Sequence, residues 1–592
     1  MLFYDFEVFK YDWLVVIIDV TRRKEHVIIN DPDELNRVYQ ANKSDIWVGF
    51  NSRDYDQYIL KGILCDFDPK EINDFIIVGH NKGWQFSSLF RKFPLNNYDV
   101  MPQPPIGLKT LEAFMGHNIK ETSVPFNIDR PLTKTELDET ITYCRHDVEE
   151  TIEVFLQKKE EFDSHLSLIK TFKLPLSYIG KTKAQLSAII LGAVKREHYD
   201  EFDIEIPDTL RLEKYGKVLN WYLNPVNRDY SQTLEMEVAG VPHVFAWGGL
   251  HGAISQYSGE GWFLNIDVAS YYPSLMLRYG WISRNVQDPS KYEDVYHTRL
   301  KLKAEKNPMQ QPYKIVLNST YGAMKDKHNP LFDPRQANNV CVGGQLLLLD
   351  LIERLEGHCQ LIQSNTDGLI VKLYHPDDYE VIDDICWEWE QRTGMNLEFD
   401  EYAKIFQKDV NNYVIVDFDG HYKSKGAYVK KLSALDFDLP IVNEALMNYL
   451  LHGVTPEKTI GECADLCRFQ KVVKVSSKYL HGLYSPTITE QKIRDGQGRL
   501  KTIKVFSGGE IQTDKTFRVF ASSDPRDGGL FKVSGKLTPR GDPKNPEKFG
   551  NTPEHCFIMN GAVDGVPIPE KLDREWYINL AWERLQDFGV VR

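Results

Sequence analysis

The sequence lacks a long apolar run and an export signal. No apolar stretch reaches the ~18 residues that span a bilayer, and the nearest, Val340–Ile352, contains two Gly, a Gln and an Asp. The first residues, MLFYDFEVFK, carry carboxylates where a secretory signal is basic and then apolar. We therefore expect neither a membrane protein nor an exported one.

Cysteine is also scarce. Eight cysteines among 592 residues are too few for a disulfide framework, which favours a reducing, cytoplasmic compartment. The one close pair, Cys463 and Cys467, has no second Cys or His pair nearby, which argues against a zinc site. Because 42% of the residues are hydrophobic, the chain can bury large cores, and its length predicts several domains.

Charge is distributed unevenly along the chain, whose net charge is −14. Residues 1–150 hold 17 Lys and Arg against 25 Asp and Glu, whereas residues 471–550 hold 16 against 8. A basic segment on an acidic chain suits a protein that grips a polyanion with one region and holds cations at carboxylates elsewhere. A solvated charged loop explains the same excess, and charge alone leaves both interpretations open.

Periodicity predicts a multidomain chain of α/β and α+β character. The first 60 residues read as short strands, DFEVF, WLVVIID, EHVII and IWVGF, separated by polar turns and followed by a helix at Tyr55–Cys65. Alternating helices and strands then predict an α/β layer fold for the first 160 residues or so. Strands alternate with helices from about 260 to 430, and an α+β region with Gly/Pro-rich loops follows.

Several carboxylates are placed to meet near the N-terminus. Asp5 and Glu7 are two apart on a predicted strand, so they face the same way. Tyr143 and Asp147 share one face of a predicted helix, and Asp56 stands near the start of another. Because gathered carboxylates repel one another, hard divalent cations are the expected ligands, and two such ions can drive phosphodiester hydrolysis. Taken alone, each of these carboxylates is better explained as a solvated surface group, because surface carboxylates are common.

The motifs DFE, NSRDYD and YCRHD, in this order, resemble the three exonuclease motifs of proofreading 3′–5′ exonucleases with a ribonuclease-H-like fold. The resemblance implies four metal ligands and a tyrosine that orients the attacking water, namely Asp5, Glu7, Asp56 and Asp147, with Tyr143. It also implies that Asn51 and Tyr55 hold the 3′ end of a single strand. Lys120 lies where family B enzymes often place a lysine near the scissile phosphate, and Lys109, in GLKTLEAF, competes for this role.

Three further segments combine carboxylates with a cationic, aromatic helix. NIDVASYYPSLM puts Asp267 at the end of an apolar strand, and LIQSNTDGLIV puts Asp367 in a tight turn between two strands. KIVLNSTYG puts Lys314, Asn318 and Tyr321 on one stripe of a helix. Singly, such a tyrosine is usually core and such an aspartate usually forms a turn. Together they provide what nucleotidyl transfer needs, two aspartates that hold two Mg²⁺ and groups that bind the triphosphate and stack on the nucleotide.

These segments resemble motifs A, B and C of family B DNA polymerases, whose patterns DxxSLYPS, KxxxNSxYG and DTD occur here as DVASYYPS, KIVLNSTYG and NTD. The resemblance implies Asp267 and Asp367 as catalytic metal ligands, helped by the backbone carbonyl of Val268. It implies Tyr272 as the steric gate that excludes a ribose 2′-hydroxyl, with Tyr271 as the next candidate.

The resemblance also implies nucleotide and DNA contacts. Arg299 and Lys303, in RLKLK, would complete a triphosphate clamp with Lys314, and a solvated helix face is the competing interpretation. The nucleotide-binding candidates are Tyr272, Arg299, Lys303, Lys314, Asn318 and Tyr321. AWGGLHG resembles a loop that links exonuclease and polymerase regions, and KDVNNYV with KSKG resembles a degenerate primer-holding motif, although a plain surface strand competes. The DNA-binding candidates here are Gly248, Gly249, Lys408, Tyr413 and Lys425.

The resemblance implies a ribonuclease-H-like exonuclease domain followed by a palm–fingers–thumb right hand. We expect the exonuclease at residues 1–165, a linker and the first part of the palm at 166–285, short fingers at 286–330, the second part of the palm at 331–432, and the thumb and C-terminal region at 433–592. Lys314 follows Asp267 by 47 residues and precedes Asp367 by 53, which leaves no room for terminal-protein insertions. We expect no domain ahead of the exonuclease and a compact replicase of a bacteriophage or mobile element.

The leading hypothesis is a DNA-dependent DNA polymerase with a built-in 3′–5′ proofreading exonuclease and two Mg²⁺ or Mn²⁺ ions at each site. The expected partners are primer–template DNA, dNTPs and a single-stranded 3′ end. We expect a monomer in a bacterial host cytoplasm, with replisome accessory proteins as candidate partners. Because Asn365 replaces the first aspartate of the third motif, one alternative is a nuclease whose polymerase half only binds DNA. Another is a replication scaffold that binds primer–template without catalysis.

Overall fold

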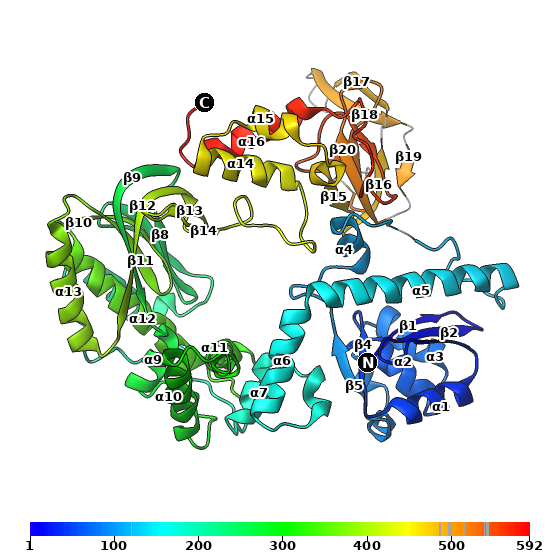
Figure 1. The fold of residues 1–592 in the computed structure, drawn as a ribbon, viewed down its shortest axis with the longest axis horizontal. Coiled ribbons are helices and arrows are strands. Elements are labelled where there is room, and N and C mark those ends of the chain that lie inside the picture. The colour runs from blue at the N-terminus through cyan, green and yellow to red at the C-terminus, as the bar shows by residue number, and fades with distance from the viewer. Residues whose placement is uncertain are drawn as a thin grey trace.

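The computed structural model describes residues 1–119, 121–484, 487–494, 500–507, 510–512, 515–537, 539 and 544–592. Figure 1 shows an N-terminal domain (residues 1–157, blue to cyan), a central domain (216–425, green) and a C-terminal domain (440–592, yellow to red). The predicted α/β and α+β multidomain class is confirmed. In the described part of the chain, every helix is too short or too polar to cross a membrane.

The N-terminal domain contains a five-stranded sheet in the order β3-β2-β1-β4-β5. Its strands are β1 (Leu2–Val8), β2 (Trp13–Asp19), β3 (Lys24–Ile29), β4 (Ile46–Gly49) and β5 (Asn96–Asp99). Strands β1 to β3 run antiparallel, whereas β4 and β5 run parallel to β1. The helices of this domain are α1 (Pro32–Asn42), α2 (Asp56–Ile63), α3 (Pro69–Asn73), α4 (Leu108–Phe114) and α5 (Lys134–Gln157). The long helix α5 packs on β1 and β2.

Helix α1 corrects the expectation that strands and polar turns fill the first 60 residues. The side chain of Asp31 caps this helix by accepting a hydrogen bond from the backbone N–H of Glu34 at 2.8 Å. Pro32 occupies the first turn, where its missing N–H removes no intrahelical bond. The residues DPDE therefore carry a helix-start signal that the polar-turn interpretation overlooked.

The central domain is built on a nine-stranded sheet in the order β14-β13-β12-β9-β11-β10-β8-β7-β6. The strands are β6 (Thr233–Val238), β7 (Val241–Ala246), β8 (Gly249–Ala253), β9 (Tyr257–Val268), β10 (Cys359–Ser364), β11 (Gly368–Leu373), β12 (Leu397–Asp409), β13 (Asn412–Val416) and β14 (Tyr422–Lys425). The apolar runs predicted as strands at WFLNIDV, LIQSN, GLIVKLY and YVIVDF all lie in this sheet. Segments far apart in the sequence thus share one sheet, while the predicted domain limits stay a prediction.

Helices surround this sheet and connect it to the N-terminal domain. They are α6 (Lys159–Thr171), α7 (Lys183–Ile190), α8 (Gly216–Leu223), α9 (Tyr271–Arg278), α10 (Ser290–Ala304), α11 (Gln310–Lys325), α12 (Pro334–Leu355) and α13 (Asp378–Thr393). Helix α11 packs on α10 and also on α6 and α7. One continuous apolar core therefore extends from the N-terminal sheet through these helices to the central sheet.

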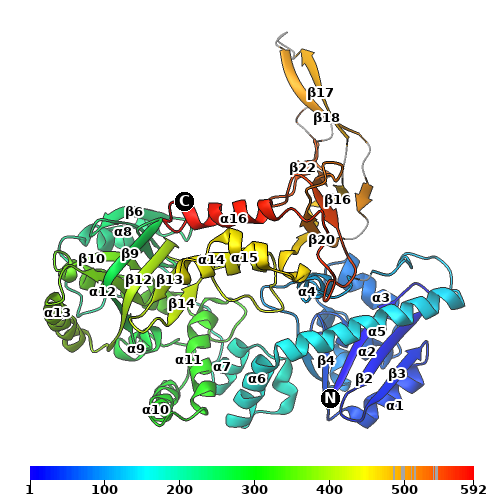
Figure 2. The same cartoon turned by 45° about the horizontal axis from the view of Figure 1, so that its top comes forward.

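The C-terminal domain combines α-helices with small sheets. The helices are α14 (Pro440–His452), α15 (Pro456–Glu462) and α16 (Arg574–Gln586). The strands are β15 (Lys471–Lys474), β16 (Tyr479–Tyr484), β17 (Thr487–Arg494), β18 (Leu500–Ser507), β19 (Glu510–Gln512), β20 (Thr516–Ala521), β21 (Leu530–Ser534), β22 (Glu547–Lys548) and β23 (Cys556–Ile558). The antiparallel pair β17–β18 projects away from the rest of the molecule (Figure 2). Strands β15 and β20 contact α4, so the C-terminal domain packs against the N-terminal domain.

Candidate active sites

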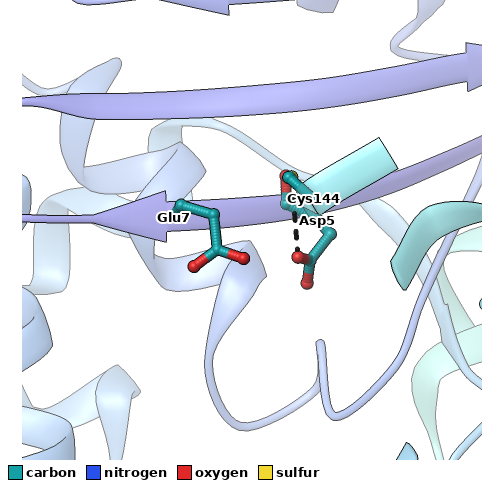
Figure 3. A group of neighbouring side chains, drawn as sticks. All are labelled: Asp5, Glu7 and Cys144. Carbon is teal, nitrogen blue, oxygen red and sulfur yellow. Dashed lines mark hydrogen bonds between the residues drawn. The ribbon is translucent and has the colours of Figure 1, made fainter. Parts of the chain in front are cut away.

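The N-terminal domain brings four carboxylates together. Asp5 and Glu7 lie on β1 with their carboxylates on the same side of the strand, as Figure 3 shows. Asp56 is the first residue of α2, and its Oδ1 accepts a hydrogen bond from the backbone N–H of Phe6 at 3.1 Å. Asp147 lies on α5. Glu7, Asp56 and Asp147 are only 6%, 2% and 9% exposed and Asp5 is partly exposed, so the acidic cluster is largely buried.

The electrostatics of this cluster reflect its burial and the mutual repulsion of its carboxylates. Burial raises the pKa of Asp5 and of Glu7 well above their usual values, and the negative charges of Asp56 and Asp147 raise them further. Burial also raises the pKa of Asp56 to about 7. Carboxylates that are desolvated and mutually repelled in this way form a donor set suited to hard cations.

Lys109 enters the same site from α4. Its Nζ lies 2.6 Å from Oδ1 of Asp147 and 2.9 Å from Oε1 of Glu112, and 4.7 Å from the centroid of the Tyr143 ring. Burial raises the pKa of Asp147, and the Lys109 ammonium opposes this rise. The structure thus places the competing candidate Lys109 among the predicted site residues, while Lys120 lies outside the described residues.

Two further residues of this region carried little signal in the sequence. The Cys144 thiol donates to the backbone carbonyl of Asp5 at 3.3 Å and lies 3.6 Å from its carboxylate (Figure 3). Asp99, at the end of β5, accepts hydrogen bonds from the backbone N–H groups of Asn51 and Arg53, both at 3.0 Å. Asp99 therefore shapes the loop that carries Asn51, which has a positive φ of 59°.

Near this loop, Tyr55 also has a protein partner. Its hydroxyl donates to Oδ1 of Asn73 at 2.8 Å, and burial, followed by the charges of the neighbouring carboxylates, raises its pKa well above the usual value. Tyr55, which is predicted to hold the 3′ end of a single DNA strand, directly precedes Asp56 and so stands at the edge of the acidic cluster.

The central sheet forms the second carboxylate site. Asp267 is the next-to-last residue of β9, which pairs with β11 so that Asp267 stands opposite Gly368. The backbone N–H of Val268 donates to the carbonyl oxygen of Asp367 at 2.8 Å, which ties the two predicted motifs together. Both aspartates line a cleft of about 480 Å³ together with His251, Asn265, Asn365, Thr366, Tyr402, Asn411, Tyr413, Ile415, Lys423, Ser424 and Lys425.

Amide side chains organise the two aspartates. Nδ2 of Asn265 donates to Oδ2 of Asp267 at 2.5 Å. Burial raises the pKa of Asp267 to about 6, and the charges of Asp367 and Asp400 contribute to the rise. Oδ1 of Asn365 accepts a hydrogen bond from the backbone N–H of Asp367 at 3.3 Å. Asn265 was missed in the sequence, although its place two residues before Asp267 on a strand puts it on the same face.

Two of the predicted nucleotide-binding tyrosines are in contact with each other. Tyr272 on α9 and Tyr321 on α11 have ring centroids 4.3 Å apart. Tyr271 is buried, and its hydroxyl donates to the carbonyl oxygen of Gly344 at 2.6 Å, so it belongs to the core. Lys314 and Asn318 are exposed on α11, the same helix as Tyr321.

Two predicted phosphate-binding residues are held by protein groups. Nη1 of Arg299 donates to Oγ of Ser270 at 2.6 Å, and only 8% of this arginine is exposed. Lys303 forms an ion pair with Glu398 at 3.1 Å. Both lie on α10, which packs against α11, but neither lines the cleft of the two aspartates.

The predicted DNA contacts are divided. Tyr413 and Lys425 line the cleft beside the two aspartates. Lys408 lies elsewhere, because its Nζ pairs with Asp587 at 2.8 Å and stands 4.5 Å from the ring centroid of Tyr428. Gly248, in the turn between β7 and β8, and Gly249, which begins β8, are outside the cleft lining.

Comparisons with known proteins connect parts of this chain with DNA polymerases. No family model matches the chain. DNA polymerase 1 of Sulfurisphaera ohwakuensis is 24% identical over 180 residues, which are 30% of this chain and 20% of that protein. DNA polymerase 1 of Sulfolobus acidocaldarius is 27% identical over 132 residues, 22% of this chain and 15% of that protein. The chain thus spans about a fifth of the length of the first of these curated relatives.

A solved structure is also similar to the chain. It is the family B DNA polymerase from the hyperthermophilic archaeon Pyrobaculum calidifontis, with a TM-score of 0.41 and 14% identity. The alignment covers 100% of this chain and 78% of that one.

Proposed function

We propose that this chain is a DNA-dependent DNA polymerase of the family B type with a 3′–5′ exonuclease in a separate domain. The observation that carries the proposal is the presence of two distinct carboxylate centres. One is buried between β1, α2 and α5, and the other lies at a cleft across β9 and β11 beside Tyr413 and Lys425. The partial sequence similarity to archaeal DNA polymerases supports the polymerase assignment.

Divalent cations fit both centres. The carboxylates of the first centre raise one another's pKa, which is the signature of a donor set that a cation stabilises. Asp267 and Asp367 face the same cleft, and the charge of Asp367 raises the pKa of Asp267. Mg²⁺ or Mn²⁺ held by these oxygens supplies the positive charge that activates a hydroxyl or a water and stabilises the leaving oxygen.

The side chains of the central domain orient the substrates of polymerisation. Lys425 and Tyr413 lie along the cleft wall, where an ammonium contacts a DNA phosphate and an aromatic ring contacts the sugar. Tyr272, packed on Tyr321, limits the space beneath the incoming sugar. Lys314, which lies on α11 with Tyr321, presents an exposed ammonium to the triphosphate.

In the N-terminal domain, neighbouring groups position a single-stranded 3′ end. Lys109, which is paired with Asp147 and lies over the Tyr143 ring, places a positive charge where a phosphodiester approaches the carboxylates. Tyr55, directly before Asp56, and Asn51, in the loop that precedes it, hold the terminal nucleotides. The mixed sheet of this domain, with α5 packed on one face, supports the ribonuclease-H-like assignment. The short spacing of the polymerase motifs supports a replicase of a phage or mobile element.

A nuclease-first function is the second candidate, because Asn365 brings no charge to the cleft. The test uses two assays on the purified full chain with Mg²⁺, namely extension of a primer on a template with dNTPs, and shortening of a labelled single strand without dNTPs. Activity in both assays is the expected result. Shortening without extension favours the nuclease-first function, and binding without either reaction favours a scaffold.

A further inference from the structure

Arg518, on β20, is a completely buried cation that connects two domains. None of its surface is exposed to solvent. Its guanidinium donates to five uncharged oxygens, namely Oε1 of Gln470 (2.8 Å) and the carbonyl oxygens of Ala113 (2.9 Å), His117 (3.0 Å), Gly561 (2.8 Å) and Met559 (3.3 Å). In the described part of the chain, the structure gives Arg518 no carboxylate partner.

This arrangement makes the docked position of the two domains specific. A buried charge is costly unless its donors are all hydrogen-bonded, and a guanidinium has five N–H donors in a fixed fork. Burial lowers the pKa of Arg518 to about 10, so the group stays charged at neutral pH. Ala113 and His117 belong to the N-terminal domain and the other three acceptors to the C-terminal domain. The full set of five bonds therefore exists only when the domains are docked.

Other contacts also fix how the two domains pack at this interface around Arg518, which we call the joint. Nε2 of Gln470 donates to the carbonyl oxygen of Phe114 at 2.9 Å. The backbone N–H of Val563 donates to the carbonyl of Gly116 at 3.0 Å. Gly116 has a φ of 79°, and a Cβ there would lie 2.9 Å from Sγ of Cys467, so the two domains approach closely at this glycine.

The joint holds the end of α4, which is the helix that supplies Lys109 to the acidic cluster. Ala113 and Phe114 are the last residues of α4, and the carbonyl oxygen of Ala113 also accepts the backbone N–H of Gly116 at 3.1 Å. From the C-terminal domain, Arg518 donates to the carbonyl oxygen of Ala113, and Gln470 donates to that of Phe114. One turn earlier, Lys109 pairs with Asp147. A short helix of seven residues therefore carries the joint at one end and a site residue at the other.

We propose that Arg518 is a positioning residue for the exonuclease centre: it fixes α4, and through α4 it holds Lys109 beside Asp147, so that removal of a 3′ nucleotide requires the docked C-terminal domain. The inference rests on the proposed exonuclease function. Arg518 touches neither carboxylates nor substrate and acts through the helix alone.

The chain offers a matched control for this arginine. Arg574, on α16, also donates to backbone carbonyls, those of Ile460, Gly461 and Cys463, but all three lie within the C-terminal domain. Arg518→Met and Arg574→Met each remove a guanidinium that satisfies carbonyl oxygens. Arg518→Lys keeps the charge but reduces five donors to three.

The experiment measures shortening of a 5′-labelled single strand by each full-length variant, with kcat and KM, and the melting temperature of each. Arg518→Met is expected to lower kcat at least about tenfold with KM nearly unchanged, because small displacements of a site residue cost rate. Arg518→Lys is expected to recover part of this loss. Arg574→Met is expected to keep the parent kcat even if its melting temperature falls as much as that of Arg518→Met.

A double-mutant cycle with Lys109→Met tests the route through α4. If Arg518 acts only by placing Lys109, Arg518→Met adds no further loss of kcat in the Lys109→Met background. The inference is overturned if the kcat losses of Arg518→Met and Lys109→Met multiply in the double variant. It is also overturned if Arg518→Met and Arg574→Met lose equal amounts of kcat. Should Arg518→Met fail to fold, a parent kcat in Arg518→Lys overturns it as well. A parent chain that shortens no strand overturns the exonuclease proposal itself, which separates the two failures.

Discussion

Gly368 leaves the space that the carboxylate of Asp267 occupies on the neighbouring strand. A Cβ at position 368 would lie 2.0 Å from Oδ1 of Asp267 and 3.0 Å from the carbonyl oxygen of Ile266. Asp267 on β9 stands opposite Gly368 on β11, and Gly368 directly follows Asp367 in the chain. The absence of a side chain at 368 therefore lets the two aspartates approach across the strands.

Replacing Gly368 by alanine tests this relationship. The added methyl group has to displace the Asp267 carboxylate, so we expect the rate of primer extension to fall about 100-fold. Shortening of a single strand is expected to stay at the parent rate, because the acidic cluster lies in another domain. Gly461→Ala is the control, since a Cβ there meets nothing within 4 Å. Parent extension rates in Gly368→Ala would show that Asp267 can move without loss.

The two carboxylate centres are expected to be separable by mutation. Asp5→Ala with Glu7→Ala removes two ligands of the first centre and should abolish strand shortening while extension continues. Asp267→Asn should do the reverse, because an amide brings no charge to hold Mg²⁺. Both assays, run on both variants with matched melting temperatures, check this. Loss of both activities in the folded double variant contradicts a two-centre enzyme.

Metal binding should stabilise the N-terminal domain in a pH-dependent way. The folded chain raises the pKa of Asp5 and Glu7, and that of Asp56 to about 7, whereas unfolded carboxyl groups titrate near about 4. Groups with raised folded pKa values stabilise the fold below the unfolded value, and this contribution is lost as the pH rises toward about 7.

We therefore expect the melting temperature in a chelator to fall as the pH rises from about 5 to 8, and added Mg²⁺ to restore it most at the upper end. Asp5→Asn with Glu7→Gln removes the charges without changing the shape, so this variant should melt higher in chelator at pH 8 and respond less to Mg²⁺. Identical pH and Mg²⁺ responses in parent and variant would contradict a cation site at these carboxylates.

Sugar selection is expected to depend on Tyr272. Trimming it to Val opens space beside Tyr321, so ribonucleotide incorporation should rise by a large factor while dNTP use continues. Tyr271→Phe is the matched control, because it removes only the hydroxyl that donates to Gly344 and should cost about 1 kcal/mol of stability without changing selectivity. The ratio of the kcat/KM values for dNTPs and rNTPs measures the effect. An unchanged ratio in Tyr272→Val places the gate elsewhere.

Local patterns predicted the secondary structure that carries each site. The sequence placed Asp267 at a strand end, Asp367 in a hairpin turn and Tyr143 with Asp147 on one helix face, and the structure agrees. These features depend on residues a few positions apart.

Contacts between distant segments were not predictable in the same way. Lys109 and Asp147 are 38 residues apart, and Arg518 lies 405 residues from Ala113. Spacing along the chain gives no information about such pairs, because they meet only through packing of α4 against α5 and β20. The pairing of Lys408 with Asp587 was hidden for the same reason, since nothing near Lys408 in the sequence indicates that α16 ends beside it.

The third polymerase motif gives the last prediction, which concerns Asn365. Its Oδ1 accepts the backbone N–H of Asp367 across the turn at 3.3 Å, and both residues line the cleft. A carboxylate at 365 accepts the same hydrogen bond, so the turn should survive Asn365→Asp. The two charges that hold the cations come from Asp267 and Asp367, so a neutral group at 365 leaves that pair intact.

We therefore expect the natural chain to extend primers, Asn365→Asp to extend them at a rate within a few-fold of the parent, and Asp367→Asn to be inactive. Both substitutions leave the side-chain volume almost unchanged, but Asp367→Asn removes a ligand charge whereas Asn365→Asp adds a charge. Comparing the two variants therefore shows at which position, 367 or 365, the charge is needed. Primer extension over a series of Mg²⁺ concentrations measures both. A folded natural chain that extends no primer, and gains extension on Asn365→Asp, would instead favour the nuclease-first function.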